Sequence, residues 1–425
     1  MRKSLSILSR IMTLAVTVVI LLSCTPTPAK AAKKELYIFN CGDYIAETTV
    51  EKFEKAYPEY DVIYEVFDTN EAMYQKLVSS NIPYDVLIPS DYMIERLIKE
   101  DRLKEIDMSQ LENYKYIGDA YKNTNYDPNN KYSVPYMWGT LGLIYNPELV
   151  AEEDIQTWSV MWNEKYKNMA SAKDSVRDTY VVGSMYYHRE TLMSLKADYE
   201  NGIISSEEYN EQVSKIMNDT NNIPGIEKVL KEMKKNIFGF EVDSGKNDIV
   251  TGKIAINVAW SGDAVYSMDV AEEEEEVYLN YIVPEEGGNI WFDGWVMPKG
   301  ANKELAQDFV NFLCNPSIAS RNKGYIGYTT AIAGDEIFEL VNDWYAAEEG
   351  GEAADLSYFF GDTISSEYME DGKAIVYVEE RGRQFDAQFP SEDVIIRCAV
   401  MEDFKEKNDE VLAMWVSVKL GDFSI

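Results

Sequence analysis

The fold is decided by the stretch ELYIFNCGDYIAETTVEKFEKAYPEYDVIYEVFDTNEAMYQKLVSSNIPYDVLIPS, residues 35–90. Short apolar segments lie at 36–39, 62–66 and 86–88, and such segments are typical of buried strands. Stretches with helical periodicity separate them, and the first helix is expected to stop before Pro58 because proline restricts the residue before it. This βαβαβ order predicts a parallel, doubly wound α/β sheet.

Three loops of this sheet are the expected place for a ligand. In open parallel sheets, ligands bind beyond the carboxyl ends of the strands. The loops that follow the three predicted strands are residues 40–44, 68–70 and 90–92. We therefore expect them to line a binding site.

The rest of the chain repeats the α/β alternation without an internal repeat. A second apolar pattern covers 135–145, a largely helical stretch covers 176–235, and a strand is predicted at 254–260. An extended segment follows at 278–284, and a further helix is expected to end before Pro316. The chain is longer than one core usually absorbs, so we expect two α/β lobes with more than one crossing between them.

Composition and charge exclude several classes of function. The 425 residues carry a formal net charge of −34, which disfavours nucleic acid and anionic lipid surfaces as partners. There is a single histidine, His188, which excludes metal clusters held by several imidazoles. A catalytic triad would have to use this one residue. The four cysteines are widely spaced and form neither a disulfide framework nor a zinc pattern.

The first residues read as an export signal. Basic residues precede an apolar run at 11–22, which is short for a membrane span and ends at Cys24. The ending Leu-Leu-Ser-Cys resembles the lipobox of bacterial lipoproteins, which implies a signal peptide at 1–24, lipidation of Cys24 and a flexible tether at 25–34. An ordinary secretory leader cut after residues 29–31 is the alternative, and both readings export the chain.

Three segments combine aromatic and acidic residues where strands meet loops, at 40–44, 260–263 and 291–295. Ring faces attract ammonium groups and cover methylene chains, while carboxylates fix charged ends. The pattern therefore favours a cleft for a flexible organic cation. A single tryptophan of this kind is more often a core residue, so the prediction depends on the combination occurring in three segments.

Several segments in order resemble one family. They include 40–45, 69–74, 84–90 and 132–139, and the likeness extends over most of residues 35–333. They resemble the signature segments of bacterial spermidine/putrescine-binding proteins, the extracytoplasmic receptors of polyamine ABC transporters.

The resemblance implies a type II periplasmic-binding-protein-like fold, with a doubly wound sheet in each of two lobes and the ligand cleft between them. The first lobe would comprise residues 35–139 and about 293–345. The second lobe would comprise residues 140–292 and about 346–425.

The resemblance also implies a set of cleft residues. Asp293 would be the central carboxylate that pairs with an amine, Asp178 would be an acidic anchor in the second lobe, and Trp260 and Trp291 would sandwich the methylene chain. The remaining ligand-binding residues would be Asp43, Tyr44, Ser90, Tyr92 and Tyr328.

The chain departs from the family at three of these places. Cys41 stands where the family often has a tryptophan, and Ser175, with Asp174 beside it, stands where the family has a second acid. Met401 aligns with a glutamine of the family. These changes affect which amine is preferred more than the class of ligand.

The implied function is capture without catalysis: a lipid-anchored receptor on the extracytoplasmic side of the membrane that binds spermidine or putrescine and delivers it to an ABC transporter permease. No catalytic residue, metal or cofactor is expected, and the protein is expected to be a monomer without nucleic acid. Two alternatives remain open. One is a receptor for another cargo, such as a sugar, peptide, metal chelate or thiamine-like cation, and the other is an exported glycoside hydrolase with paired carboxylates.

Overall fold

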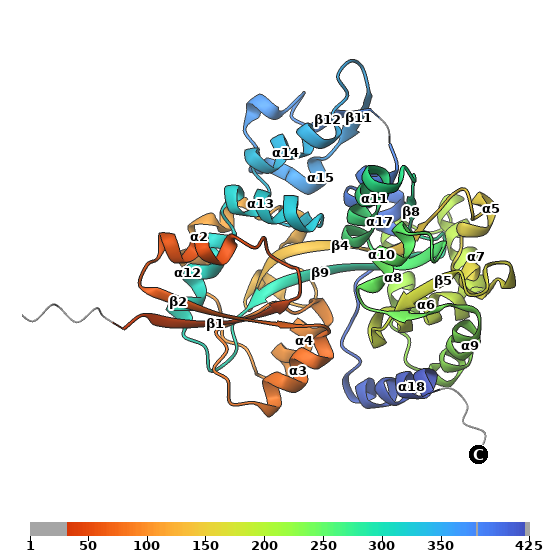
Figure 1. The fold of residues 1–425 in the computed structure, drawn as a ribbon, viewed down its shortest axis with the longest axis horizontal. Helices are drawn as coiled ribbons and strands as arrows, with labels where there is room; N and C mark the ends of the chain where they lie inside the picture. Colours follow the sequence, from red (N-terminus) through yellow and green to blue (C-terminus); the bar gives the residue numbers. More distant parts are fainter. Residues whose placement is uncertain (1–31, 380, 421–425) are drawn as a thin grey trace, which may run out of the picture.

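The computed structural model describes residues 32–379 and 381–420, which form two α/β lobes joined by a pair of long strands (Figure 1). Most strands belong to one continuous hydrogen-bonded sheet with the order β2-β1-β3-β9-β4-β7-β5-β6, to which β8, β10 and β13 are attached. Strands β2, β1 and β3 at one end of this order belong to the first lobe, and strands β7, β5 and β6 at the other end belong to the second.

The first lobe is the βαβαβ unit that the sequence predicts. Strand β1 (Lys34–Cys41) pairs in parallel with β2 (Tyr60–Phe67) and with β3 (Val86–Leu87). Its helices are α2 (Thr49–Ala56), α3 (Asn70–Ser79), α4 (Asp91–Lys99), α12 (Lys303–Leu313) and α13 (Pro316–Ile326), with short 3-10 turns at Met108–Gln110, Glu112–Tyr116, Asp119–Tyr121 and Pro128–Asn130. The expected helix ends hold, because α2 stops before Pro58 and α12 stops before Pro316.

The two long strands run through both lobes. Strand β4 (Ser133–Tyr145) pairs antiparallel with β9 (Gly288–Val296), and every residue of both strands is buried. The first part of β4 also pairs with β10 (Thr329–Thr330) of the first lobe, while its last residues pair with β7 and β8 of the second. The expected lobe boundaries at residues 139/140 and 292/293 therefore fall inside continuous strands.

The second lobe surrounds strands β5 (Ala170–Lys173), β6 (Gly239–Glu241), β7 (Ile256–Trp260) and β8 (Asn280–Ile282). Strand β5 pairs in parallel with β6 and β7. Its principal helices are α6 (Val176–Tyr187), α7 (Arg189–Glu200), α8 (Ser206–Met217), α9 (Ile223–Asn236), α10 (Ser244–Val250), α11 (Ser261–Glu275) and α18 (Asn408–Leu420). Its shorter elements are α5 (Glu152–Ile155), α16 (Arg383–Gln388), α17 (Glu392–Ile396), β13 (Cys398–Ala399) and 3-10 turns at Trp158–Trp162, Glu164–Tyr166 and Lys405–Lys407.

A small cap lies beside α13 and consists of sequence beyond residues 35–333, over which the family resemblance extends (Figure 1). It consists of α14 (Asp335–Tyr345), α15 (Ser357–Phe360), the hairpin β11 (Glu352–Asp355) and β12 (Ile375–Val378), and 3-10 turns at Gly361–Thr363 and Ser366–Tyr368. Its rings form its core: Phe338 meets Phe360 at 5.2 Å between ring centroids, and Phe359 stacks on Trp138 at 5.4 Å.

These contacts differ from the expected assignment of residues 346–425 to the second lobe. Phe359 stacks on Trp138 in the first-lobe part of β4, and Phe359 and Phe360 also pack on Phe389, which follows α16. We propose that the cap belongs to the first lobe, because α14 packs on α13.

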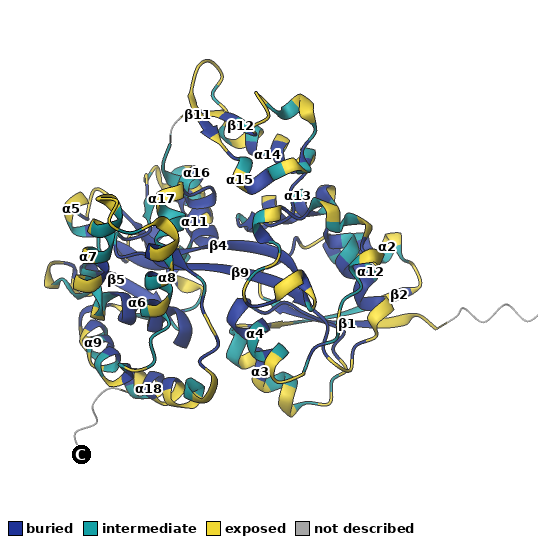
Figure 2. Cartoon of the chain, turned by 180° about the vertical axis from the view of Figure 1, so that it is seen from behind, coloured by how far each residue is buried: buried dark blue, intermediate teal, exposed yellow. Residues whose placement is uncertain are grey.

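Figure 2 shows that the buried residues follow the strands and the inner faces of the helices, whereas exposed residues cover the outer surface. None of the helices in the described residues combines the length and the apolar composition that a bilayer crossing requires.

Candidate ligand-binding cleft

A cavity of about 580 Å³ lies between the two lobes, at the carboxyl ends of the strands. Its wall is formed by loops after β1, β2 and β3, by the amino-terminal turns of α4, α6 and α11, and by strand β9. The size suits a small organic molecule. The position agrees with the expectation that the loops 40–44, 68–70 and 90–92 line a site.

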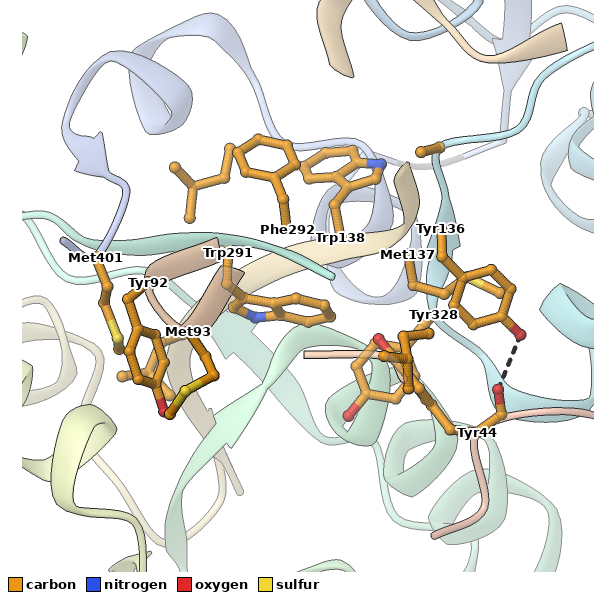
Figure 3. Packing of buried hydrophobic residues seen from close by; sticks show 14 of the residues in the cluster. Tyr44, Tyr92, Met93, Tyr136, Met137, Trp138, Trp291, Phe292, Tyr328 and Met401 are labelled. Atoms are coloured by element: carbon orange, nitrogen blue, oxygen red, sulfur yellow. Dashed lines mark hydrogen bonds between the residues drawn. The ribbon is translucent and has the colours of Figure 1, made fainter. Parts of the chain in front are cut away.

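Alternation along β9 places its functional side chains. Successive residues of a strand point to opposite faces, and Asn289, Trp291 and Asp293 all line the cavity. In Figure 3, Trp291 lies between Tyr92 and Tyr328, on the opposite side of the strand from Phe292. The Trp291 and Tyr328 rings meet edge to face at 5.5 Å. One strand thus offers an aromatic face and a carboxylate to the same space.

The Asp293 carboxylate is held on one side and unpaired on the other. Its Oδ2 accepts a 2.5 Å hydrogen bond from the Tyr44 hydroxyl, while Oδ1 is buried without a hydrogen-bond partner. Burial raises the pKa of Asp293 to about 6, although the hydroxyls of Ser90 and Tyr44 lower it and the charge of Asp178 raises it. A buried oxygen of this kind is costly unless a donor or cation reaches it from the cavity.

The opposite wall presents Asp178 and Trp260. Asp178 lies in the first turn of α6, and its Oδ1 accepts a 3.3 Å hydrogen bond from the Trp260 indole nitrogen. Ser175 caps the helix by accepting from the Asp178 backbone N–H at 3.3 Å. Burial raises the pKa of Asp178, and the hydrogen bonds from Ser175 and Trp260 partly offset this. The indole therefore fixes the carboxylate at the edge of its own ring.

A lysine lies behind Trp260. The Lys173 ammonium is 3.1 Å from Glu241, 3.2 Å from Asp263 and 4.4 Å from the centre of the Trp260 ring. The Lys173 side chain is 1% exposed. Asp263 also accepts a 2.8 Å hydrogen bond from the Tyr328 hydroxyl, which comes from the first-lobe side.

A second group of residues connects the lobes at the other end of the cavity. The guanidinium of Arg177 lies 4.2 Å from the Tyr92 ring centre and 3.7 Å from that of Phe404. The Tyr92 hydroxyl donates to Glu71 at 3.0 Å. Burial raises the pKa of Glu71, while the positive charge of Arg177 lowers it. These contacts join α4 of the first lobe to α6 of the second.

All nine cleft residues expected from the sequence lie in the wall of this cavity. They are Asp43, Tyr44, Ser90, Tyr92, Asp178, Trp260, Trp291, Asp293 and Tyr328. The positions that depart from the family, Cys41, Ser175 and Met401, line it as well. The lipidation site, Cys24, lies outside the described residues. The roles of these residues in binding remain predictions.

The sequence reasoning missed the charged residues of the second lobe. Lys173, Arg177 and Glu241 all reach the cavity, yet none was expected there. The signal was present, because Lys173 and Glu241 end the parallel strands β5 and β6, and such ends meet at one edge of a sheet. The segment at 170–173 is short and not strongly apolar, so it was not recognised as a strand.

Comparison with known proteins agrees with this geometry. Residues 48–339 match the family model described as bacterial extracellular solute-binding protein. The chain belongs to this family. The family is one of solute-binding proteins, which are not enzymes.

The relatives include named polyamine receptors. The spermidine/putrescine-binding periplasmic protein of Salmonella typhimurium is 29% identical over 297 residues, which are 69% of this chain and 77% of that protein. The putrescine-binding periplasmic protein PotF of Escherichia coli is 29% identical over 315 residues, 71% of this chain and 79% of that protein.

A solved relative supports the two-lobed type II fold of the solute-binding proteins. The spermidine/putrescine ABC transporter substrate-binding protein PotD of Streptococcus pneumoniae is 28% identical and superposes with a TM-score of 0.61. The comparison covers 91% of this chain and 99% of that one. The fold expected from the sequence is therefore confirmed.

Proposed function

We propose that this protein is an extracytoplasmic receptor that binds a polyamine, spermidine or putrescine, and delivers it to the permease of an ABC transporter. The observation that carries the proposal is the unpaired, buried Oδ1 of Asp293 beside the Trp291 ring. An ammonium group donates to such an oxygen, and the methylene chain that follows it packs on the indole face. The names of the relatives support the same cargo.

Binding would close the two lobes around the amine. The cavity takes residues from both lobes, so a ligand that contacts Asp293 and Asp178 together stabilises the closed arrangement. The closed receptor is then the form that the permease recognises. Function on this view is capture and delivery, and no side chain needs to react.

Isothermal titration calorimetry with putrescine and spermidine tests the cargo. We expect Asp293→Asn and Trp291→Ala to weaken amine binding at least about tenfold, since a charge-assisted hydrogen bond contributes about 1.5–3 kcal/mol and an aromatic contact with a cation about 0.5–2 kcal/mol. Matched controls are Asp101→Asn and Trp344→Ala, whose side chains are exposed and lie outside the cavity.

Thermal unfolding of each variant without ligand shows whether it is folded. Wild-type affinity in both cleft variants would contradict the assignment of the site. Absence of any amine binding by the wild-type protein would contradict the proposed cargo, and a screen of sugars and amino acids would then follow.

We further propose that the mature protein is anchored by a lipid on Cys24. The lipobox-like ending of the apolar segment supports this. In cells that process lipoproteins, the wild-type chain is expected in the membrane fraction and Cys24→Ala in the soluble fraction. Equal partitioning of the two would favour an ordinary secretory leader.

A further inference from the structure

The carboxylates that line the cavity differ in whether the protein itself neutralises them. Three of them, Asp43, Asp68 and Asp243, are exposed and belong to the rim. Water and salt screen charges at such positions. The buried or half-buried ones are Glu71, Asp91, Asp174, Asp178, Glu241, Asp263 and Asp293.

Three of these buried or half-buried carboxylates have protein partners at the edge of the cavity. Asp91 accepts from the backbone N–H groups of Tyr92 and Phe292, at 2.7 and 3.0 Å. Asp174 pairs with Lys419 at 2.7 Å. Glu71 lies in the field of Arg177 and accepts the Tyr92 hydroxyl.

Lys173 satisfies two more. Its single ammonium lies within 3.2 Å of both Glu241 and Asp263, and it also donates to the Val242 carbonyl at 3.0 Å. Glu241 is further tied to the Gly245 backbone N–H at 2.8 Å. Buried charges are retained when they are paired and hydrogen-bonded in this way. Lys246 also lies 3.8 Å from Asp263, so two ammonium groups match the two acids, which therefore offer little to an incoming cation.

Two buried carboxylates accept hydrogen bonds only from neutral groups. Burial raises the pKa of Asp178, and the charges of Lys173 and Arg177 offset part of this from beyond salt-bridge distance. Asp293 accepts from the Tyr44 hydroxyl and keeps a bare oxygen, and Asp178 accepts from the Trp260 indole. Among the described residues, no lysine or arginine lies within salt-bridge distance of either. Both carboxylates sit beside a tryptophan ring that faces the cavity, Asp293 beside Trp291 and Asp178 beside Trp260.

We propose that Lys173 acts as a specificity residue that restricts the cargo to a diamine, because its ammonium group occupies the carboxylates that a third amine of the ligand would need. A diamine matches the two available carboxylates, one ammonium for each. A triamine would bury a third ammonium without a partner, and an unpaired buried charge is costly. The inference rests on the proposed function, since it assumes that amines bind in this cleft.

Calorimetry with 1,4-diaminobutane and spermidine measures the preference directly. For the wild-type protein, we expect the dissociation constant of spermidine to exceed that of the diamine by about tenfold or more, the value of one charge-assisted hydrogen bond. Equal or tighter binding of spermidine overturns the inference and leaves the proposed function standing. If neither amine binds, both are overturned.

Removing the lysine should change the preference. In Lys173→Met, Glu241 loses its ammonium partner and Asp263 keeps only Lys246, at 3.8 Å. We expect the ratio of the two dissociation constants to shift toward spermidine by about tenfold. The ratio is the readout, because a general gain in negative charge alters the binding of both amines. An unchanged ratio overturns the inference.

Two further variants separate specificity from structure. The triple variant Lys173→Met, Glu241→Gln, Asp263→Asn removes the lysine and its two partner charges together, so its ratio should return to that of the wild type. Lys253→Met is the matched control, because Lys253 also pairs with a carboxylate and lies over a ring in the second lobe but is outside the cavity.

A gain-of-function variant covers the case in which Lys173→Met does not fold. Ser175 lines the cavity next to Asp178 and caps α6, and aspartate is an equally good residue at a helix N-cap. Ser175→Asp supplies a third carboxylate, and we expect it to strengthen spermidine binding relative to the diamine. Loss of both amines, or no change in their ratio, counts against the inference.

Discussion

At the scale of single residues, Asp293 shows how one carboxylate is prepared for a ligand. Tyr44 holds one of its oxygens and burial leaves the other bare, so the free protein carries an unfavourable charge. A bound ammonium removes that cost. The same burial that makes the site unfavourable when empty makes it selective for cations when filled.

The pKa of Asp293 predicts how binding depends on pH. In the free protein this pKa is raised to about 6 by burial, so the carboxylate is protonated below pH 6 and ionised above it. An ammonium binds the ionised form, so protons compete with the ligand at low pH. We expect the dissociation constant to be nearly constant from pH 7 to 8 and to rise about tenfold from pH 7 to 5.

Calorimetric titrations across this range measure the effect. Asp293→Asn serves as the control, because its residual binding should lack the rise near pH 6. Equal affinity of the wild-type protein at pH 5 and 7 would show that Asp293 does not pair with the amine.

Sequence reasoning worked best for residues at the ends of recognisable strands. Tyr44, Ser90 and Asp293 were expected in the cleft, and all three line it. Lys173 was missed because its importance comes from partners on β6 and α11, which lie far from it in the chain. A local sequence pattern does not predict which carboxylate a lysine will pair with.

At the scale of secondary structure elements, the contact between α13 and α16 contains a second unusual charge. Lys323 is fully buried, contacts the Gln388 side-chain oxygen, and lies 4.8 Å from the Trp344 ring centre and 5.5 Å from that of Phe389. Burial lowers the pKa of Lys323 to about 7. The unfolded chain holds this proton up to a pH near that of an ordinary lysine.

Stability should therefore rise with pH through this group. Between about pH 7 and 10 the unfolded state binds more protons at Lys323 than the folded state, so raising the pH favours folding. From pH 7 to 9 we expect Lys323 to contribute about 1–3 kcal/mol to that rise. Urea unfolding at both pH values should show a smaller rise for Lys323→Met than for the wild type.

Two controls make this comparison specific. Lys165→Met removes an exposed lysine and should leave the rise unchanged. The double variant Lys323→Met, Gln388→Met avoids leaving the Gln388 oxygen unpaired. Identical pH dependence in the wild type and Lys323→Met would show that the buried lysine stays protonated in both states.

Elements were predictable where their periodicity was strong. The strands and helices of residues 35–90 were placed within a few residues, because apolar segments and a proline delimit them. The cap was not predictable, because its core comes from rings that are far apart in the sequence: Phe338 meets Phe360, and Phe359 stacks on Trp138.

At the scale of the whole molecule, several contacts cross between the lobes. The Asp403 backbone N–H donates to Glu95 at 2.7 Å, the Tyr328 hydroxyl donates to Asp263, and Arg177 stacks on Tyr92. The structure thus represents a closed arrangement. Rings of the cap also pack on the α16 region of the second lobe, with Phe359 5.3 Å from Phe389 and Tyr345 5.3 Å from Phe385.

Small-angle X-ray scattering can test this closure. We expect the radius of gyration of the free protein to exceed that of the protein saturated with putrescine, because the ligand joins Asp293 to Asp178 across the cavity. Arg177→Met removes the contact with Tyr92 and should raise the radius of gyration of the free protein. Identical scattering curves with and without ligand would contradict ligand-driven closure.

Because both lobes share strands β4 and β9, the chain cannot be divided into two separate lobes. Each lobe depends on residues 133–145 and 288–296, which lie in the middle of the polypeptide, so neither half can be excised as a free-standing unit. A stop codon near position 287 would remove β9 and leave the edge of β4 that pairs with it without hydrogen-bond partners. Deletion mapping is therefore expected to give insoluble products, and functional dissection has to proceed by point substitution.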